Sequence, residues 1–130
     1  MIAYVETSAA VKLFRDEPES SAVEAYLNRL DASEDGIASS TLLETELRRA
    51  AIRRGIAQTT VTEILDRLDI FDLSRSMFTE AGLLPNAHLC SLDAVHVVAA
   101  LRIGADVMVS YDKRQLDAAE AAGLHVVSPS

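Results

Sequence analysis

The sequence has a single cysteine, few basic residues and no long apolar run, and each of these shortages excludes a class of protein. Cys90 has no partner for an internal disulfide, which fits a reducing cytoplasm, and we expect it to be a buried thiol beside an apolar helix. The opening MIAYVETSAA carries no basic segment, and no stretch reaches the length of about 20 apolar residues that a membrane helix needs. We therefore expect a cytoplasmic protein that is neither secreted nor inserted in a membrane.

Positive charge is scarce. Lysine and arginine number 12 against 20 aspartates and glutamates, and the net charge of −8 is unfavourable for nonspecific binding to nucleic acid. A nucleic-acid substrate would have to be bound locally, by a basic patch or by metal ions. Two basic clusters are candidates for contacts with phosphates: Arg48, Arg49, Arg53 and Arg54, and Lys113 with Arg114. The alternative is a solvated face paired with nearby acids.

The chain of 130 residues is long enough for one domain with a substantial core, and 49% of its residues are hydrophobic. Short apolar segments typical of strands occur at residues 2–5, 37–38, 70–73, 107–109 and 125–127. Segments typical of helices separate them, at residues 9–14, 19–30, 42–54, 59–68, 74–84, 91–103 and 113–122. This alternation predicts a single α/β domain over residues 1–130, a three-layer α/β/α sandwich around a mainly parallel sheet of four or five strands.

Four carboxylates occupy similar positions in this pattern although long segments separate them. Each lies where a predicted strand passes into a helix, or just inside the start of a helix: Glu6, Glu46, Asp93 and Asp112. In a parallel α/β sheet the strand ends and the loops after them meet at one crevice, so these side chains can converge. Carboxylates gathered without lysines among them suggest a site for a hard divalent cation.

Two of these acids have alternatives. Asp93 begins an apolar helix, where an unpaired carboxylate would be costly, so it either binds a metal or caps the helix and bonds Ser91. Glu46 competes with Glu44, but helical spacing places Glu46 on or near the apolar face. We expect Glu44 to face solvent and pair with Arg48.

The other two acids are each accompanied by a serine. Ser8 lies two residues after Glu6, and Ser110 lies two residues before Asp112. Their hydroxyls could hydrogen-bond metal-bound waters or orient the carboxylates, which is the supporting role that metal sites require. We therefore expect Ser8 and Ser110 to support the acidic site.

Other chemistries find little support. A haloacid-dehalogenase-type phosphatase would need aspartates at the positions of Glu6 and Ser8, and a response-regulator receiver would need an acidic pair there. No glycine-rich nucleotide loop occurs, and no cysteine or histidine spacing makes a zinc site. His96 lies three residues after Asp93 and either borders the crevice or packs as a polar core residue, whereas Asp117 is expected to be a solvated helix acid.

The sequence resembles a PIN domain, and more narrowly a VapC-type toxin of a type II toxin–antitoxin pair. Four segments carry this resemblance over essentially the whole chain: IAYVETSAAVKLF, SSTLLETELRRA, LDAVHVVAALRIGADVMVSYDKR and AAGLHVVSP. The resemblance places the family's four acids on Glu6, Glu46, Asp93 and Asp112, and its metal-facing hydroxyl on Ser110. It implies an endoribonuclease that depends on Mg²⁺ or Mn²⁺, a structured RNA substrate, a cognate VapB-like antitoxin whose tail fills the groove, and a homodimer.

One residue departs from the family's pattern. The first acid is usually aspartate, and here it is Glu6, whose side chain is one methylene longer. Because a misplacement of about 1 Å can lower a rate roughly a hundredfold, this substitution bears on activity more than on fold. It supports a second interpretation, in which the chain is a catalytically weak or inactive PIN-like module that binds RNA or protein.

Overall fold

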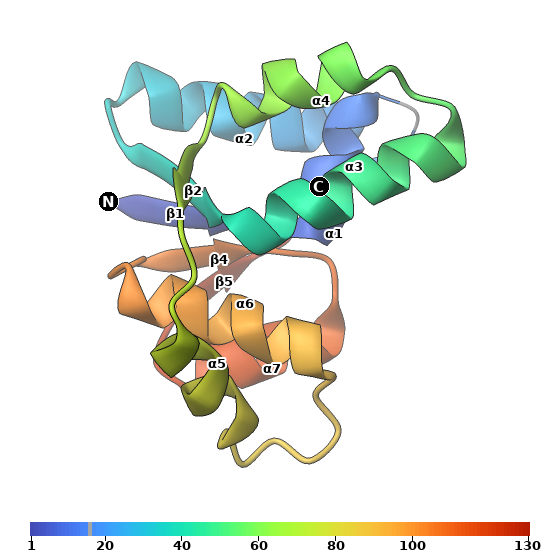
Figure 1. Cartoon of the computed structure of the whole chain (residues 1–130). Helices are drawn as coiled ribbons and strands as arrows, with labels where there is room; N and C mark the ends of the chain where they lie inside the picture. The colour runs from blue at the N-terminus through green and yellow to red at the C-terminus, as the bar shows by residue number, and fades with distance from the viewer. Residues whose placement is uncertain (16) are drawn as a thin grey trace.

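A computed structural model describes residues 1–15 and 17–130 of the chain. In these residues five parallel strands form one sheet, in the order β3-β2-β1-β4-β5 (Figure 1). The strands are β1 (Ile2–Val5), β2 (Gly36–Ser40), β3 (Asp69–Phe71), β4 (Val107–Val109) and β5 (His125–Val127). Every neighbouring pair is parallel, which confirms the predicted α/β architecture in its five-stranded form.

The helices cover both faces of the sheet, as the alternating sequence predicts (Figure 1). One layer contains α1 (Thr7–Ala10), the 3₁₀ helix η1 (Val11–Phe14), α2 (Ser20–Ala32), α3 (Thr41–Arg54) and α4 (Gln58–Leu65). The opposite layer contains α5 (Arg75–Gly82), α6 (Ser91–Arg102) and α7 (Lys113–Ala121). Among the described residues, none of these helices is long and apolar enough to cross a membrane.

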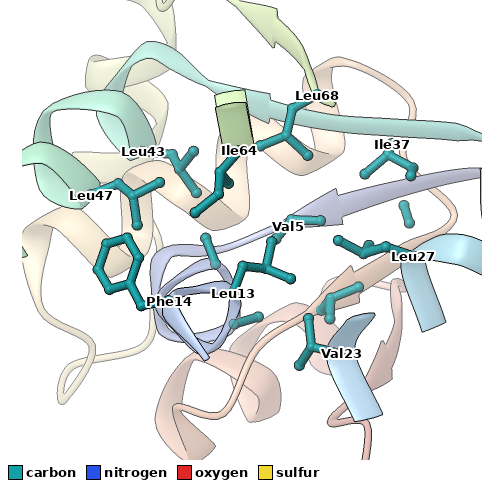
Figure 2. Packing of buried hydrophobic residues seen from close by; sticks show 14 of the residues in the cluster. Val5, Leu13, Phe14, Val23, Leu27, Ile37, Leu43, Leu47, Ile64 and Leu68 are labelled. Atoms are coloured by element: carbon teal, nitrogen blue, oxygen red, sulfur yellow. The ribbon is translucent and has the colours of Figure 1, made fainter. Parts of the chain in front are cut away.

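Strand alternation divides the core between the two layers. Ala3 and Val5 of β1 belong to the cluster with the helices α1 to α4, and Figure 2 shows Val5 packed among their side chains. Tyr4 and Met108 point to the opposite face and pack with α6 and α7. This division follows from the period of two along a strand, which sends successive side chains to opposite faces.

The structure differs from the predictions in several local details, including some element boundaries and the exposure of Cys90. The first helix is split, because the α-helical turn at Thr7–Ala10 continues as the tighter 3₁₀ helix η1. The third strand is Asp69–Phe71, shorter than predicted and at the edge of the sheet. Cys90 was expected to be buried, but it is exposed, because it precedes α6 at the N-cap position rather than lying within the helix.

The strand order places the chain's topological switch at β1 and β4. From β1 the sheet grows on one side through β2 and β3, and on the other side through β4 and β5. Open parallel sheets bind ligands at the crevice outside the carboxyl ends of the strands where the order reverses. Glu6 directly follows β1 and Ser110 directly follows β4, so both residues lie at this crevice.

Candidate active site

Glu6 is a buried carboxylate held by two serines. It follows β1, caps α1 and is only 5% exposed. Its Oε1 accepts hydrogen bonds from the Ser8 backbone N–H at 3.0 Å, from the Ser110 hydroxyl at 2.8 Å and from the Ser8 hydroxyl. The Ser8 hydroxyl also accepts a hydrogen bond from the Tyr111 N–H at 2.8 Å. The ends of β1 and β4 are therefore joined through the Glu6 carboxylate.

Asp112 lies on the other side of these serines, at the start of α7. Its Oδ1 accepts the Gln115 backbone N–H at 3.1 Å, and its own N–H donates to the Ser110 hydroxyl at 3.1 Å. Gln115 is fully buried and ties α7 to α6, because its side-chain amide donates to the Asp93 carbonyl oxygen at 3.2 Å. The helix cap thus fixes the Asp112 carboxylate at the crevice, with its second oxygen in no hydrogen bond among the described residues.

Glu46 ends a chain of hydrogen bonds that begins deep in the sheet. The Ser40 hydroxyl contacts the Tyr4 hydroxyl at 2.9 Å, which contacts His96 Nδ1 at 2.6 Å. His96 Nε2 then lies 2.5 Å from Glu46 Oε1, and the Thr7 hydroxyl donates to the same oxygen at 2.6 Å. We call Ser40, Tyr4, His96 and Glu46 the Glu46 hydrogen-bond chain. It links β2, β1, α6 and α3 at the mouth of the crevice.

The surroundings of Glu46 favour its ionised form. Burial on its own would raise the pKa of Glu46, but the hydrogen bond and charge of His96, with the Thr7 hydrogen bond, outweigh burial and lower the pKa below its usual value. His96 can donate through Nε2 in either protonation state, while Nδ1 accepts from Tyr4 when the ring is neutral. Burial also raises the pKa of Tyr4, so its hydroxyl keeps its proton and stays available as a donor.

Asp93 has the opposite environment. It lies in the first turn of α6 without capping it, since Cys90 holds the cap position, and its carboxylate accepts no hydrogen bond from the described residues. Burial raises the pKa of Asp93, and the negative charges of Asp112, Glu6 and, more weakly, Glu46 raise it further, against a smaller opposing effect of His96. The other three acids therefore lie near enough to Asp93 to raise its pKa.

The donor set suits a hard divalent cation in chemistry but is not arranged as a finished ligand shell. Four carboxylates supply only oxygen, and a cation would relieve the repulsion that raises the pKa of Asp93. Yet in residues 1–15 and 17–130 no three histidine, cysteine, aspartate or glutamate side chains are grouped closely enough to hold a metal. At Glu6 and Glu46 the Oε1 atoms are turned instead toward serines and toward His96.

Two further acids behave as the sequence predicts. Glu44 pairs with Arg48 at 3.1 Å, one turn along α3, and so does not compete with Glu46 for the crevice. Asp117 is exposed and lies 3.6 Å from Lys113 on α7. Both contacts are surface ion pairs, which contribute little to stability.

Sequence reasoning missed three polar residues that organise the site: Tyr4, Thr7 and Gln115. Tyr4 stands in an apolar strand, Thr7 precedes a predicted helix, and Gln115 is one polar residue in a helix with many. The one available signal was the position of His96, a histidine within an otherwise apolar helix segment that needs buried partners.

Comparison with known proteins gives a consistent result. The PIN domain family model matches residues 3–121. The ribonuclease VapC35 of Mycobacterium tuberculosis is 40% identical over 133 residues, covering 97% of this chain and 96% of that protein. The toxin–antitoxin complex VapBC2 of Rickettsia felis, solved with a DNA fragment from its promoter, matches with a TM-score of 0.77 at 20% identity over 98% of both chains. VapC20 of M. tuberculosis, a toxin that cleaves the sarcin–ricin loop, matches with a TM-score of 0.73 at 16% identity, over 98% of this chain and 99% of that one.

Proposed function

Because this chain belongs to the PIN-domain family, and its curated relatives are VapC ribonucleases, we propose that it is a metal-dependent endoribonuclease and the toxin of a toxin–antitoxin pair. One observation carries the proposal. Glu6, Glu46, Asp93 and Asp112 come from four separate segments, and they lie near enough to the switch point of a parallel sheet for the other three charges to raise the pKa of Asp93. Such a crevice can hold an RNA phosphodiester over a cluster of carboxylates.

Glu6, Asp93 and Asp112, with Glu46 directly or through water, would hold one or two Mg²⁺ or Mn²⁺ ions. When bound, such ions lower the pKa of water and stabilise negative charge on a phosphate. The residues of the chain prepare this arrangement. Ser8 and Ser110 orient Glu6, the start of α7 holds Asp112, and Asp93 stays without hydrogen bonds among the described residues, so that its oxygens are free to bind.

Glu46 is suited to orient the attacking water. Its lowered pKa keeps it ionised near neutral pH, and its second oxygen, Oε2, has no hydrogen bond among the described residues. A carboxylate held in this way can accept a hydrogen bond from water and draw off a proton as the water attacks phosphorus. We expect products with 5′-phosphate and 3′-hydroxyl ends.

A VapB-like antitoxin is the partner that this function requires, since an unregulated ribonuclease would damage its own cell. The solved structures that share the fold include complexes of VapC with VapB-type partners, which supports this assignment. The exposed apolar side chains of Phe78 and Leu83 offer surface for protein contacts, and we propose that the protein also forms a homodimer. Light scattering of the purified chain tests the dimer.

The central experiment is cleavage of a purified RNA mixture by the wild-type protein with Mg²⁺, with Mn²⁺ and with EDTA, followed by mapping of the product ends. We expect cleavage with either metal and none with EDTA. The Asp93→Asn variant should retain its circular dichroism spectrum and lose cleavage by roughly a thousandfold or more. Asp117→Asn, which removes an exposed acid, is the matched control and should cleave normally. An Asp93→Asn protein that cuts RNA as fast as the wild type would overturn the proposal.

The second candidate function, a module that binds RNA or protein without turnover, is favoured by Glu6. The longer side chain is engaged by two serines, and three acids are not grouped as metal ligands in the described residues. The Glu6→Asp variant separates the candidates, because a large gain in cleavage would indicate a site degraded by the longer residue. Equal or lower activity of Glu6→Asp would indicate that the site is adapted to glutamate.

A further inference from the structure

The structure divides the four arginines of α3 into two kinds. Arg48 donates to Glu44 at 3.1 Å and to Gln58 at 3.0 Å, so its guanidinium is fixed against α4. Arg54 donates to Glu17 at 2.7 Å and lies over the Phe14 ring. Arg49 and Arg53 are exposed and make no ion pair or hydrogen bond with the described residues.

The two unpaired arginines share one face of α3 with Glu46. They line a groove of about 380 Å³ together with Thr7 and Glu46 at the catalytic end and with Leu42 and Leu92 as apolar walls. Because an α-helix rises about 1.5 Å per residue, Arg49 lies about 4.5 Å and Arg53 about 10.5 Å beyond Glu46 along the axis. Their positions on the helix are thus one turn, about 6 Å along the axis, apart, and side chains that leave the same face at this spacing can reach successive phosphates of a nucleic-acid strand.

We propose that Arg49 and Arg53 bind successive phosphates of the single-stranded RNA on one side of the cleavage site. This inference rests on the proposed ribonuclease function, and it places the RNA strand on one side of the cleavage site along α3, beyond Glu46. We call the groove lined by Thr7, Leu42, Glu46, Arg49, Arg53 and Leu92 the arginine groove.

Charge complementarity favours an RNA strand as the ligand of the arginine groove. The chain carries a net charge of −8, and the acids at the crevice repel phosphate, so local cations are needed where the strand enters. An unpaired guanidinium offers two parallel donors to a phosphate, whereas Arg48 and Arg54 have already committed theirs to carboxylates or an amide. Leu42 and Leu92, which is 50% exposed, provide apolar surface for a ribose or a base.

The test measures binding of a fluorescein-labelled, mixed-sequence oligoribonucleotide by anisotropy at several salt concentrations, with Ca²⁺ in place of Mg²⁺. The variants are Arg49→Ala, Arg53→Ala and their combination, and Arg48→Ala is the matched control from the same helix. We expect the double variant to bind at least about tenfold more weakly. The slope of log K against log salt should fall by about 0.7 for each groove arginine removed, and Arg48→Ala should leave it unchanged.

A kinetic measurement separates binding from chemistry. On a cleavable RNA with Mg²⁺, the groove variants should raise KM and leave kcat within about twofold, because the contacts exist before and during the reaction. Arg49→Lys should keep the salt slope and lose part of the affinity, since lysine retains the charge without the paired donors.

Each outcome is decisive for one of the two claims. A wild-type protein that binds RNA with the expected slopes but never cleaves it would refute the ribonuclease and leave the arginine groove as an RNA-binding site. A wild-type protein that cleaves RNA while Arg49→Ala and Arg53→Ala keep its slope and KM would refute the groove assignment alone. Loss of binding to a purified antitoxin without loss of RNA binding would also refute it, because the groove would then be a protein contact.

Discussion

Glu46 and Asp93 come from helices on opposite faces of the sheet, and the fold treats the two carboxylates in opposite ways. Glu46 receives hydrogen bonds from Thr7 and His96, and its pKa is lowered in spite of burial. Asp93 receives none among the described residues, and its pKa is raised by burial and by neighbouring acids. One acid is fixed and ionised by the protein itself, whereas the other is left in an unfavourable field that a cation would relieve.

This contrast teaches how one crevice can serve two tasks. A group that orients water must keep one position, which the Glu46 hydrogen-bond chain supplies by tying it to β1 and β2. A group that binds metal must present an oxygen free of hydrogen bonds, and the Asp93 carboxylate accepts no hydrogen bond among the described residues. On the proposed mechanism, these surroundings suit Glu46 for positioning water and Asp93 for binding a metal ion.

The largest expected effect on stability comes from removing His96, which holds Glu46. His96→Ala leaves the buried Tyr4 hydroxyl and the Glu46 carboxylate without this partner, which should lower the free energy of unfolding by about 2–4 kcal/mol. Because Glu46 is then free to move by about 1 Å, kcat should fall roughly a hundredfold while KM changes little. Urea denaturation and steady-state cleavage measure the two quantities.

Two companion variants separate positioning from stability. Val98→Ala removes a fully buried side chain from the same helix, α6, and should destabilise the protein by about 1–2 kcal/mol without changing kcat. His96→Gln keeps a side-chain N–H that can donate to Glu46, so it should recover much of kcat even if stability stays low. If His96→Gln, His96→Ala and Val98→Ala all lowered kcat by the same amount, the role of His96 in positioning Glu46 would be wrong.

A smaller effect on stability should follow from removing the charge of Asp93. Since its folded pKa is raised, the stability that Asp93 contributes is fully present below its ordinary pKa of about 4 and is lost as pH rises through the raised value. Without metal, Asp93→Asn should therefore be more stable than the wild type at pH 7, by about 1 kcal/mol after screening by solvent.

Thermal unfolding of both proteins in EDTA across the acid to neutral range measures this difference. The difference in stability should vanish at low pH. In a separate measurement without EDTA, millimolar Mg²⁺ should stabilise the wild type but not Asp93→Asn. Asp117→Asn, at an exposed position, should have the stability of the wild type at pH 7 and should be stabilised by Mg²⁺ to the same extent. Parallel stability curves for the wild type and Asp93→Asn would mean that the neighbouring acids do not act on Asp93.

The sequence was sufficient to predict those features that follow from periodicity. Alternating apolar segments predicted the five strands and the two helical layers, and the parallel order explains why acids after β1 and before α7 share one crevice. The helical position of Glu46 also separated it correctly from Glu44, which pairs with Arg48. These predictions depend on local spacing, which a single sequence records.

The hydrogen bonds across the core could not be predicted in the same way. Tyr4 looks like an ordinary core residue of a strand, and nothing in its spacing shows that its hydroxyl meets His96, 92 positions later. Which oxygen of Glu6 is engaged by Ser8 and Ser110 likewise depends on side-chain rotamers. Such contacts join residues through the packing of separate layers, so only the folded structure reveals them.

The smallest expected effect comes from cutting the Glu46 hydrogen-bond chain at its far end. Tyr4→Phe keeps the ring that packs against α6 and α7 and removes only the hydroxyl shared by His96 and Ser40. Stability should fall by about 1 kcal/mol. Because Thr7 and His96 still hold Glu46, kcat should fall only about two- to fivefold. Tyr26→Phe is the matched control, since the Tyr26 hydroxyl has no hydrogen bond among the described residues, and it should change neither quantity. Cleavage rates and urea midpoints of both variants measure these effects. A Tyr4→Phe protein as slow as His96→Ala would show that the ring of His96 is held mainly by Tyr4. A Tyr4→Phe protein identical to Tyr26→Phe would show that the Glu46 hydrogen-bond chain ends at His96.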